Sequence, residues 1–156
     1  MRDTKGEKAG PYALAGYGLI ALLWLGMVCG VSFLATPVKF QAQALSLPVA
    51  LEVGNVTFAA FSRVEWGFAV LLMMMTVFAY RRRILVAVTG VAVAIVLAQT
   101  FWLLPVLDAR VAAVIAGDPL PASMHHFLYA GGEAVKALLL AGAGLFALAT
   151  LARPER

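Results

Sequence analysis

The sequence predicts an all-α integral membrane protein, a four-helix bundle with both termini on the cytoplasmic side. Composition is the first reason, because 63% of the 156 residues are hydrophobic, mean hydropathy is +0.92 and only 13% are charged. Water-soluble domains are far less apolar than this. Four long apolar stretches are the second reason, and the basic residues grouped beside them are the third. We therefore expect one transmembrane domain over residues 1–156.

The first two helices are predicted at about residues 12–36 and 49–80. Pro37 is expected to end the first. The uncharged run at 10–38 is longer than the apolar part of a signal peptide, so we expect a retained transmembrane helix. The second helix would be about 48 Å long at about 1.5 Å per residue, which exceeds the membrane thickness.

The third and fourth helices are predicted at about residues 84–104 and 122–152. Pro105 is expected to end the third, because proline interrupts helical hydrogen bonding. The proline-bounded segments 37–48 and 105–121 are then the outward-facing loops. Helix four also contains glycines that we expect to allow close helix packing, at positions 131, 132, 142 and 144.

Basic residues predict the orientation. Eight of the 12 lysines and arginines fall on one side of a four-span arrangement, namely Arg2, Lys5, Lys8, Arg81, Arg82, Arg83, Arg153 and Arg156. Because basic residues favour the cytoplasmic side, we expect a multi-pass membrane protein whose termini and turn at 81–83 are cytoplasmic. The lipid bilayer is the expected partner, together with further copies in a homo-oligomer or a larger membrane complex. No nucleic-acid module is present.

Four polar side chains are expected to form one layer within the membrane. Counted from the cytoplasmic helix ends, Glu65, Gln99, Glu133 and Lys136 lie 15–19 residues deep, which is about 22–29 Å. Charge at this depth is costly and indicates a functional site by default. The alternative is a structural role, in which these groups only bond helices together.

Helix four carries a polar stripe. At about 100° per residue, His126, Tyr129, Glu133 and Lys136 fall within an arc of about 80°, and His125 lies just outside it. In lipid, such a stripe must face protein or a water-filled cavity. A carboxylate neutralises near neutral pH more readily than a lysine does, so we expect Lys136→Met to fold better than Glu133→Leu.

The polar layer is a candidate binding site for a small polar ligand, an ion or a proton. Glu65 and Glu133 would be its ionisable groups and Lys136 their counter-charge. Gln99 and Tyr129 would be hydrogen-bond partners. No catalytic residue is predicted, because no nucleophile is accompanied by a base.

His125 and His126 are candidate metal ligands at the mouth of this site. Adjacent side chains point about 100° apart on a helix, so it is awkward for both histidines to bind the same ion. The HxxxH and HExxH spacings typical of zinc sites are also missing from the sequence. A metal ion is the one cofactor that the sequence suggests. Cys29 stands alone, so the chain has no internal disulfide.

Short motifs near the helix ends resemble those of a known family. They are Pro37-x-x-Phe40, Gly54-x-x-x-Phe58, the segment from Gln99 to Pro105, and His126. As a set they resemble a bacterial family of four-helix membrane proteins of unknown function, distantly similar to copper-resistance D membrane proteins. The resemblance implies a four-helix fold in the bacterial inner (cytoplasmic) membrane and no established reaction. Its copper association favours the metal hypothesis slightly.

Three functions therefore remain open from the sequence. The chain could bind or conduct a small polar species in an outward-facing pocket, or act as an accessory or assembly subunit whose polar stripe a partner covers. It could also be a metal-binding membrane protein or enzyme. The mass of the native complex in detergent separates the first two, and metal analysis separates the third.

Overall fold

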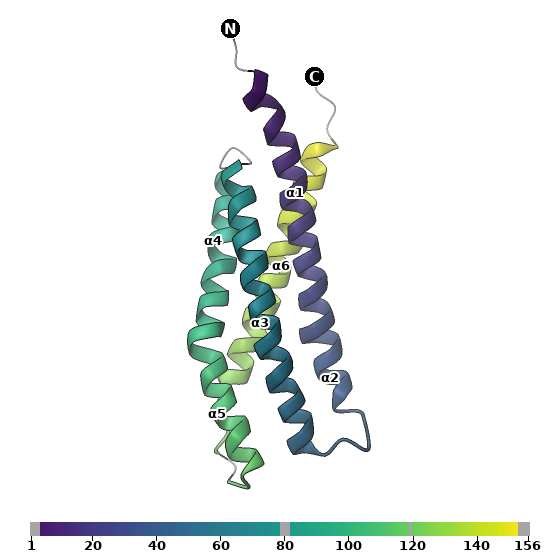
Figure 1. Ribbon diagram of the computed structural model, residues 1–156, viewed down its shortest axis with the longest axis vertical. Helices are drawn as coiled ribbons and strands as arrows, with labels where there is room; N and C mark the ends of the chain where they lie inside the picture. The colour runs from purple at the N-terminus through teal and green to yellow at the C-terminus, as the bar shows by residue number, and fades with distance from the viewer. Residues whose placement is uncertain (1–3, 79–81, 119, 153–156) are drawn as a thin grey trace.

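The computed structural model describes residues 4–78, 82–118 and 120–152, and every regular element in these ranges is helical. The elements form four long helices that run alongside one another in an elongated bundle (Figure 1). Each of the four is long and apolar enough to cross a membrane. The predicted all-α fold with four candidate spans is thus confirmed.

The first long helix consists of α1 (Thr4–Val28), the π-helical segment η1 (Cys29–Ala35) and α2 (Thr36–Lys39). The second is α3 (Leu47–Phe78). The third consists of α4 (Arg83–Ala98), the π-helical segment η2 (Gln99–Leu103) and α5 (Leu104–Ile115), and the fourth is α6 (His125–Leu151). The predicted end of the second helix at 79–80, and the predicted cytoplasmic residues Arg2, Arg81, Arg153 and Arg156, lie outside the described residues.

Each long helix packs against two neighbours. α1 contacts α3 and α6, while α4 with α5 contacts the same two helices from the other side. The order around the bundle is therefore α1, α3, α4, α6. The start of α1 and the end of α6 lie at one end of the bundle (Figure 1). The connections at 40–46 and 116–124 lie at the opposite end, which we call the loop end.

Pro37 and Pro105 do not end their helices, contrary to the sequence-based expectation. Each lies just after a π-helical segment, and the residue before each proline donates its backbone N–H to a carbonyl five residues back. Thr36 donates to Val31 and Leu104 donates to Gln99. In a regular α-helix a proline ring clashes with the carbonyl four residues back. The wider π turn opens the helix at that place and lets it continue.

The third helix ends instead at Ile115, and Gly117 just beyond it has a φ of 82°. Its N–H donates to the Val114 carbonyl, and the next N–H, from Asp118, donates to the Ala113 carbonyl. This is the Schellman arrangement, which satisfies the last carbonyls of a helix and favours glycine at the left-handed position. The predicted loop at 105–121 is consequently shortened to 116–124.

Apolar side chains cover the outside of the bundle along its length. Leu138 is 75% exposed, Phe101 72% and Leu19 61%, and similar residues occur on every long helix. On a water-soluble monomer so much contiguous apolar surface would cause association. In a bilayer this apolar surface would contact the lipid tails, which cannot form hydrogen bonds. Several polar side chains, among them Glu65, Gln99, Glu133 and Lys136, are instead buried inside the bundle, as expected for a multi-pass membrane protein.

Two of the four glycines expected to allow close packing do so. A Cβ at Gly144 would lie 2.6 Å from Leu22 Cδ2 of α1, and one at Gly132 would lie 3.2 Å from Gln99 Nε2 of η2. Gly131 and Gly142 have no such neighbour within 4 Å. The expectation was wrong for these two. Gly144 therefore marks where α6 approaches α1 most closely among the four.

Candidate functional site

Lys136 lies at the centre of a polar cluster in the bundle interior. Its side chain is 0% exposed, and its ammonium contacts the Oε1 atom of Glu65 on α3. It also donates to Glu133 Oε1 at 2.7 Å and to Gln99 Oε1 at 2.9 Å. An ammonium has three donors, so Lys136 is fully satisfied. The predicted convergence of these four side chains is what the structure shows.

The two carboxylates receive further hydrogen bonds from the other helices. Trp24 Nε1 on α1 donates to Glu65 Oε1 at 3.0 Å. Ser32 Oγ in η1 donates to Glu133 Oε2 at 2.8 Å, and Gln99 Nε2 donates to Glu133 Oε1 at 2.8 Å. All four long helices thus contribute to the cluster. Burying charge is tolerated only when it is paired and hydrogen-bonded in this way.

The charges of the cluster do not balance. Two carboxylates, Glu65 and Glu133, share the one ammonium of Lys136, and both carboxylates are 1% exposed. Glu65 Oε1 accepts two bonds, whereas no described residue donates to its Oε2. With every group ionised, the cluster carries one surplus negative charge away from water. Uptake of one proton or one small cation would remove that surplus.

The π-helical segments place two of the partners. Ser32 lies in η1, and Gln99 lies at the start of η2. A π turn contains one more residue than an α turn. The side chains that follow it therefore point in directions rotated by about 100° around the helix axis. Thr100, also in η2, accepts a 3.2 Å bond from Trp66 Nε1 and lies 3.0 Å from Ser62 Oγ. η2 therefore carries polar contacts to both α6 and α3.

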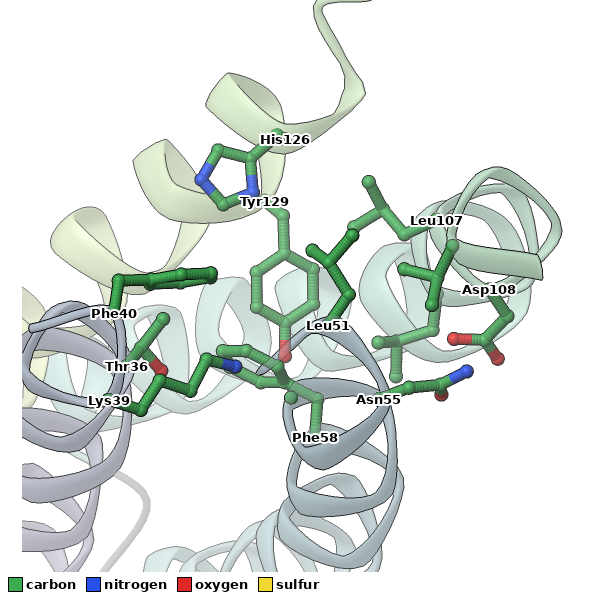
Figure 2. Close-up of a pocket in the computed structure, with 13 residues that line it drawn as sticks. Thr36, Lys39, Phe40, Leu51, Asn55, Phe58, Leu107, Asp108, His126 and Tyr129 are labelled. Carbon is green, nitrogen blue, oxygen red and sulfur yellow. The ribbon is translucent and has the colours of Figure 1, made fainter. Parts of the chain in front are cut away.

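Two adjoining cavities lie between the loop end and the cluster. The first is about 120 Å³ and the second about 620 Å³. Both are lined by Thr36, Phe40, Leu51, Phe58, His126 and Tyr129. The second also reaches Ser32 and Glu133, so it extends from the loop end to the edge of the charged cluster. Figure 2 shows side chains of α2, α3, α5 and α6 converging on the first cavity.

Tyr129 and the histidines lie nearer the loop end than the cluster. Gln99 Nε2 donates to the Tyr129 backbone carbonyl at 3.3 Å, but the Tyr129 hydroxyl has no hydrogen-bond partner among the described residues. His126 lines both cavities. The His125 ring instead lies edge-on to Trp102, 6.2 Å between centroids. Within the described ranges, neither histidine joins a group of three residues suited to holding a metal ion.

Several residues of the site were not identified from the sequence. Trp24 and Ser32 are the partners from the first helix. The signal available for Ser32 was a hydroxyl residue in an otherwise apolar stretch of the helix. The sequence around Trp24 gave no such signal, because a tryptophan in a membrane helix is commonly expected to face the lipid. Lys39 and Asp108 were assigned to loops, yet they lie on helices and line the first cavity.

A second polar group bridges the bundle nearer the end that carries the termini. Tyr17 Oη lies 3.1 Å from Thr89 Oγ1, which in turn lies 3.0 Å from Thr76 Oγ1. All three residues are buried. They carry no charge. Among the described residues, none of them forms a hydrogen bond with a residue of the charged cluster. This group is best explained as a structural link between α1, α3 and α4.

Comparison of the chain with protein-family models, curated proteins and solved structures finds no match. The function must therefore be inferred from the geometry of the chain itself.

Proposed function

We propose that this chain is a multi-pass protein of the bacterial inner membrane that takes up a proton or a small cation at Glu65, Glu133 and Lys136 from an outward-facing cavity. The observation that carries the proposal is the two-to-one ratio of buried carboxylates to ammonium. The cavity that reaches Glu133 supplies the route from the loop end. A purely structural link would need only a balanced pair.

The orientation is part of the proposal. The basic residues predict that the termini face the cytoplasm, which turns the loop end and its cavities outward. A proton or cation would then enter past His126 and Tyr129 and meet Glu133 first, because Glu133 lines the second cavity. Before the proton or cation arrives, the positive charge of Lys136 would stabilise the ionised carboxylates.

The accessory-subunit alternative has less support. It rested on a polar stripe that a partner would have to cover. Tyr129, Glu133 and Lys136 of that stripe are buried within this chain's own bundle. A partner is therefore not needed to shield them from lipid.

Infrared difference spectroscopy of the protein in lipid would test the proposal. Protonated and ionised carboxyl groups absorb at different frequencies, so a pH step or a change from a sodium-free to a sodium- or potassium-containing buffer should produce a carboxyl signal. The Glu65→Gln and Glu133→Gln variants should lose part of it. The matched control is Glu52→Gln, which changes an exposed glutamate at the start of α3. Its spectrum should lack only the signal of one surface carboxyl group.

Two results would count against the proposal. One is a wild-type spectrum with no pH- or cation-dependent carboxyl signal beyond that removed by Glu52→Gln. The other is a signal that persists unchanged in both variants of the cluster. Either would leave the cluster as a structural link between helices.

A further inference from the structure

The first cavity contains two oppositely charged side chains that have no ion pair with any described residue. Lys39, the last residue of α2, and Asp108 of α5 both line it, and neither takes part in a salt bridge within the described ranges. Figure 2 shows them on opposite sides of the cavity with Tyr129 between them. The remaining surface is mainly apolar, from Phe40, Phe58 and similar residues.

The absence of a side chain at Gly54, on the facing helix α3, leaves room for the Lys39 side chain in the cavity wall. Its ammonium lies against Gly54 of α3, where a Cβ would collide with it. It also lies 5.0 Å from the centroid of the Phe40 ring. Any larger residue at position 54 would displace the ammonium. Gly54 thus provides room for a cation at the cavity wall, and no described residue neutralises that cation.

The Tyr129 hydroxyl is the second polar group without a partner. The residue is only 4% exposed, and no described residue hydrogen-bonds to its hydroxyl. Figure 2 shows the hydroxyl pointing into the cavity. A buried hydroxyl without a hydrogen-bond partner is energetically unfavourable. A bound molecule with an acceptor beside Lys39 would satisfy both groups.

We propose that this cavity binds a small zwitterionic molecule with an apolar part. Its anionic group would contact Lys39 and Tyr129, its cationic group would contact Asp108 and Asn55, and its apolar part would lie against the phenylalanine side chains. A purely anionic ligand would face Asp108, and a purely cationic one would face Lys39. This chemistry is shared by a free amino acid and by the headgroup of a zwitterionic lipid.

This inference goes beyond the proposed uptake of a proton or cation. It requires only the cavity at the loop end, and none of its groups belongs to the charged cluster. The two can therefore fail separately. Loss of the infrared carboxyl signal would leave ligand binding intact, and loss of binding would leave the signal intact.

Three probes of matched shape test the charge requirement on the purified protein in detergent by calorimetry. Leucine carries both charges, 4-methylpentanoate lacks the ammonium, and 3-methylbutylamine lacks the carboxylate. We expect leucine to bind at least about tenfold more tightly than either analogue, since each lost charge-assisted contact has about that effect. Phosphatidylethanolamine and phosphatidylglycerol, compared in nanodiscs by native mass spectrometry, form the lipid arm, in which only the first lipid should remain bound.

Variants identify the site. Lys39→Met and Asp108→Asn should each weaken binding of the zwitterion about tenfold or more, and Tyr129→Phe by a smaller factor. Asp118→Asn removes the same charge from an exposed position near the loop end that does not line the cavity, and should have no effect. Gly54→Val should also weaken binding, because it displaces Lys39 without altering a charge.

Each outcome decides the proposal. Preference for leucine, or retention of phosphatidylethanolamine alone, with loss in Lys39→Met and Asp108→Asn, supports it and identifies the source as free solute or lipid. Equal binding of all three soluble probes, or binding of none of them, together with no lipid preference would overturn it. So would an equal effect of Asp118→Asn, which would show that only surface charge matters.

Discussion

Lys136 contacts two carboxylates, and this changes what its removal should do. The stability order expected from the sequence considered only its pair with Glu133, three residues away. In the structure it also contacts Glu65 from the opposite corner of the bundle. Removing Glu133 therefore leaves a neutral Lys136–Glu65 pair, whereas removing Lys136 leaves two buried carboxylates with no counter-charge. The order of severity expected from the pair alone is reversed.

We predict that Lys136→Met lowers the free energy of unfolding by about 3–5 kcal/mol, as breaking a buried ion pair does. Glu133→Leu should cost about 1–3 kcal/mol, because Ser32 and Gln99 lose their acceptor. A triple variant with Glu65→Leu, Glu133→Leu and Lys136→Met should be more stable than Lys136→Met, since no unpaired charge remains. Thermal unfolding in detergent measures this, and a Lys136→Met variant more stable than Glu133→Leu would contradict it.

At the scale of the elements, the two π-helical segments have related roles. Each precedes a proline by the same offset, and each carries a polar residue that hydrogen-bonds to Glu133, namely Ser32 or Gln99. The prolines were interpreted as helix ends because the wider turn leaves no clear mark in a single sequence. Extension of the helices beyond them brings Lys39 and Asp108 to the cavity. The backbone irregularities thus account for both sites.

Contact between α1 and α6 gives a prediction at this scale. Gly144→Ala would introduce a methyl group against Leu22, while Gly142→Ala on the same helix meets open space. Alanine is favoured over glycine in a helix by about 0.5–1 kcal/mol, so Gly142→Ala should match or exceed the wild-type stability. Gly144→Ala should be less stable than Gly142→Ala by about 1–3 kcal/mol, the usual cost of overpacking. Equal melting temperatures would mean that α1 and α6 are not tightly packed there.

At the scale of the whole molecule, polar side chains span both diagonals of the bundle. Lys136 on α6 contacts Glu65 on α3, and Tyr17 on α1 lies 3.1 Å from Thr89 on α4. Neighbouring helices also share hydrogen bonds, such as Trp24 to Glu65 and Gln99 to Glu133, whereas these two contacts link helices at opposite corners. In lipid, apolar packing alone distinguishes poorly between helix arrangements, because lipid tails are as apolar as the side chains. The two links therefore help to specify one arrangement of four helices.

Orientation in the membrane can be tested by cysteine labelling in a Cys29→Ser background. Ala112→Cys, exposed near the end of α5, should react with an impermeant maleimide added outside intact spheroplasts. Ala152→Cys, exposed at the opposite end of the bundle, is the matched control and should react only after permeabilisation. The reverse pattern would place the loop end in the cytoplasm and turn both cavities inward.

The sequence by itself determined the helical class, the number of candidate spans and the polar layer. Hydropathy reports span length directly, and helical periodicity places Glu133 and Lys136 on one face, since both depend only on residue order. Depth counted along each helix brought Glu65 and Gln99 to the same level. Tertiary structure then decided that these groups touch, that Trp24 and Ser32 complete them, and that the helices continue past their prolines. Those outcomes depend on which faces meet across the bundle and on how a backbone turn widens, and neither is encoded by local spacing.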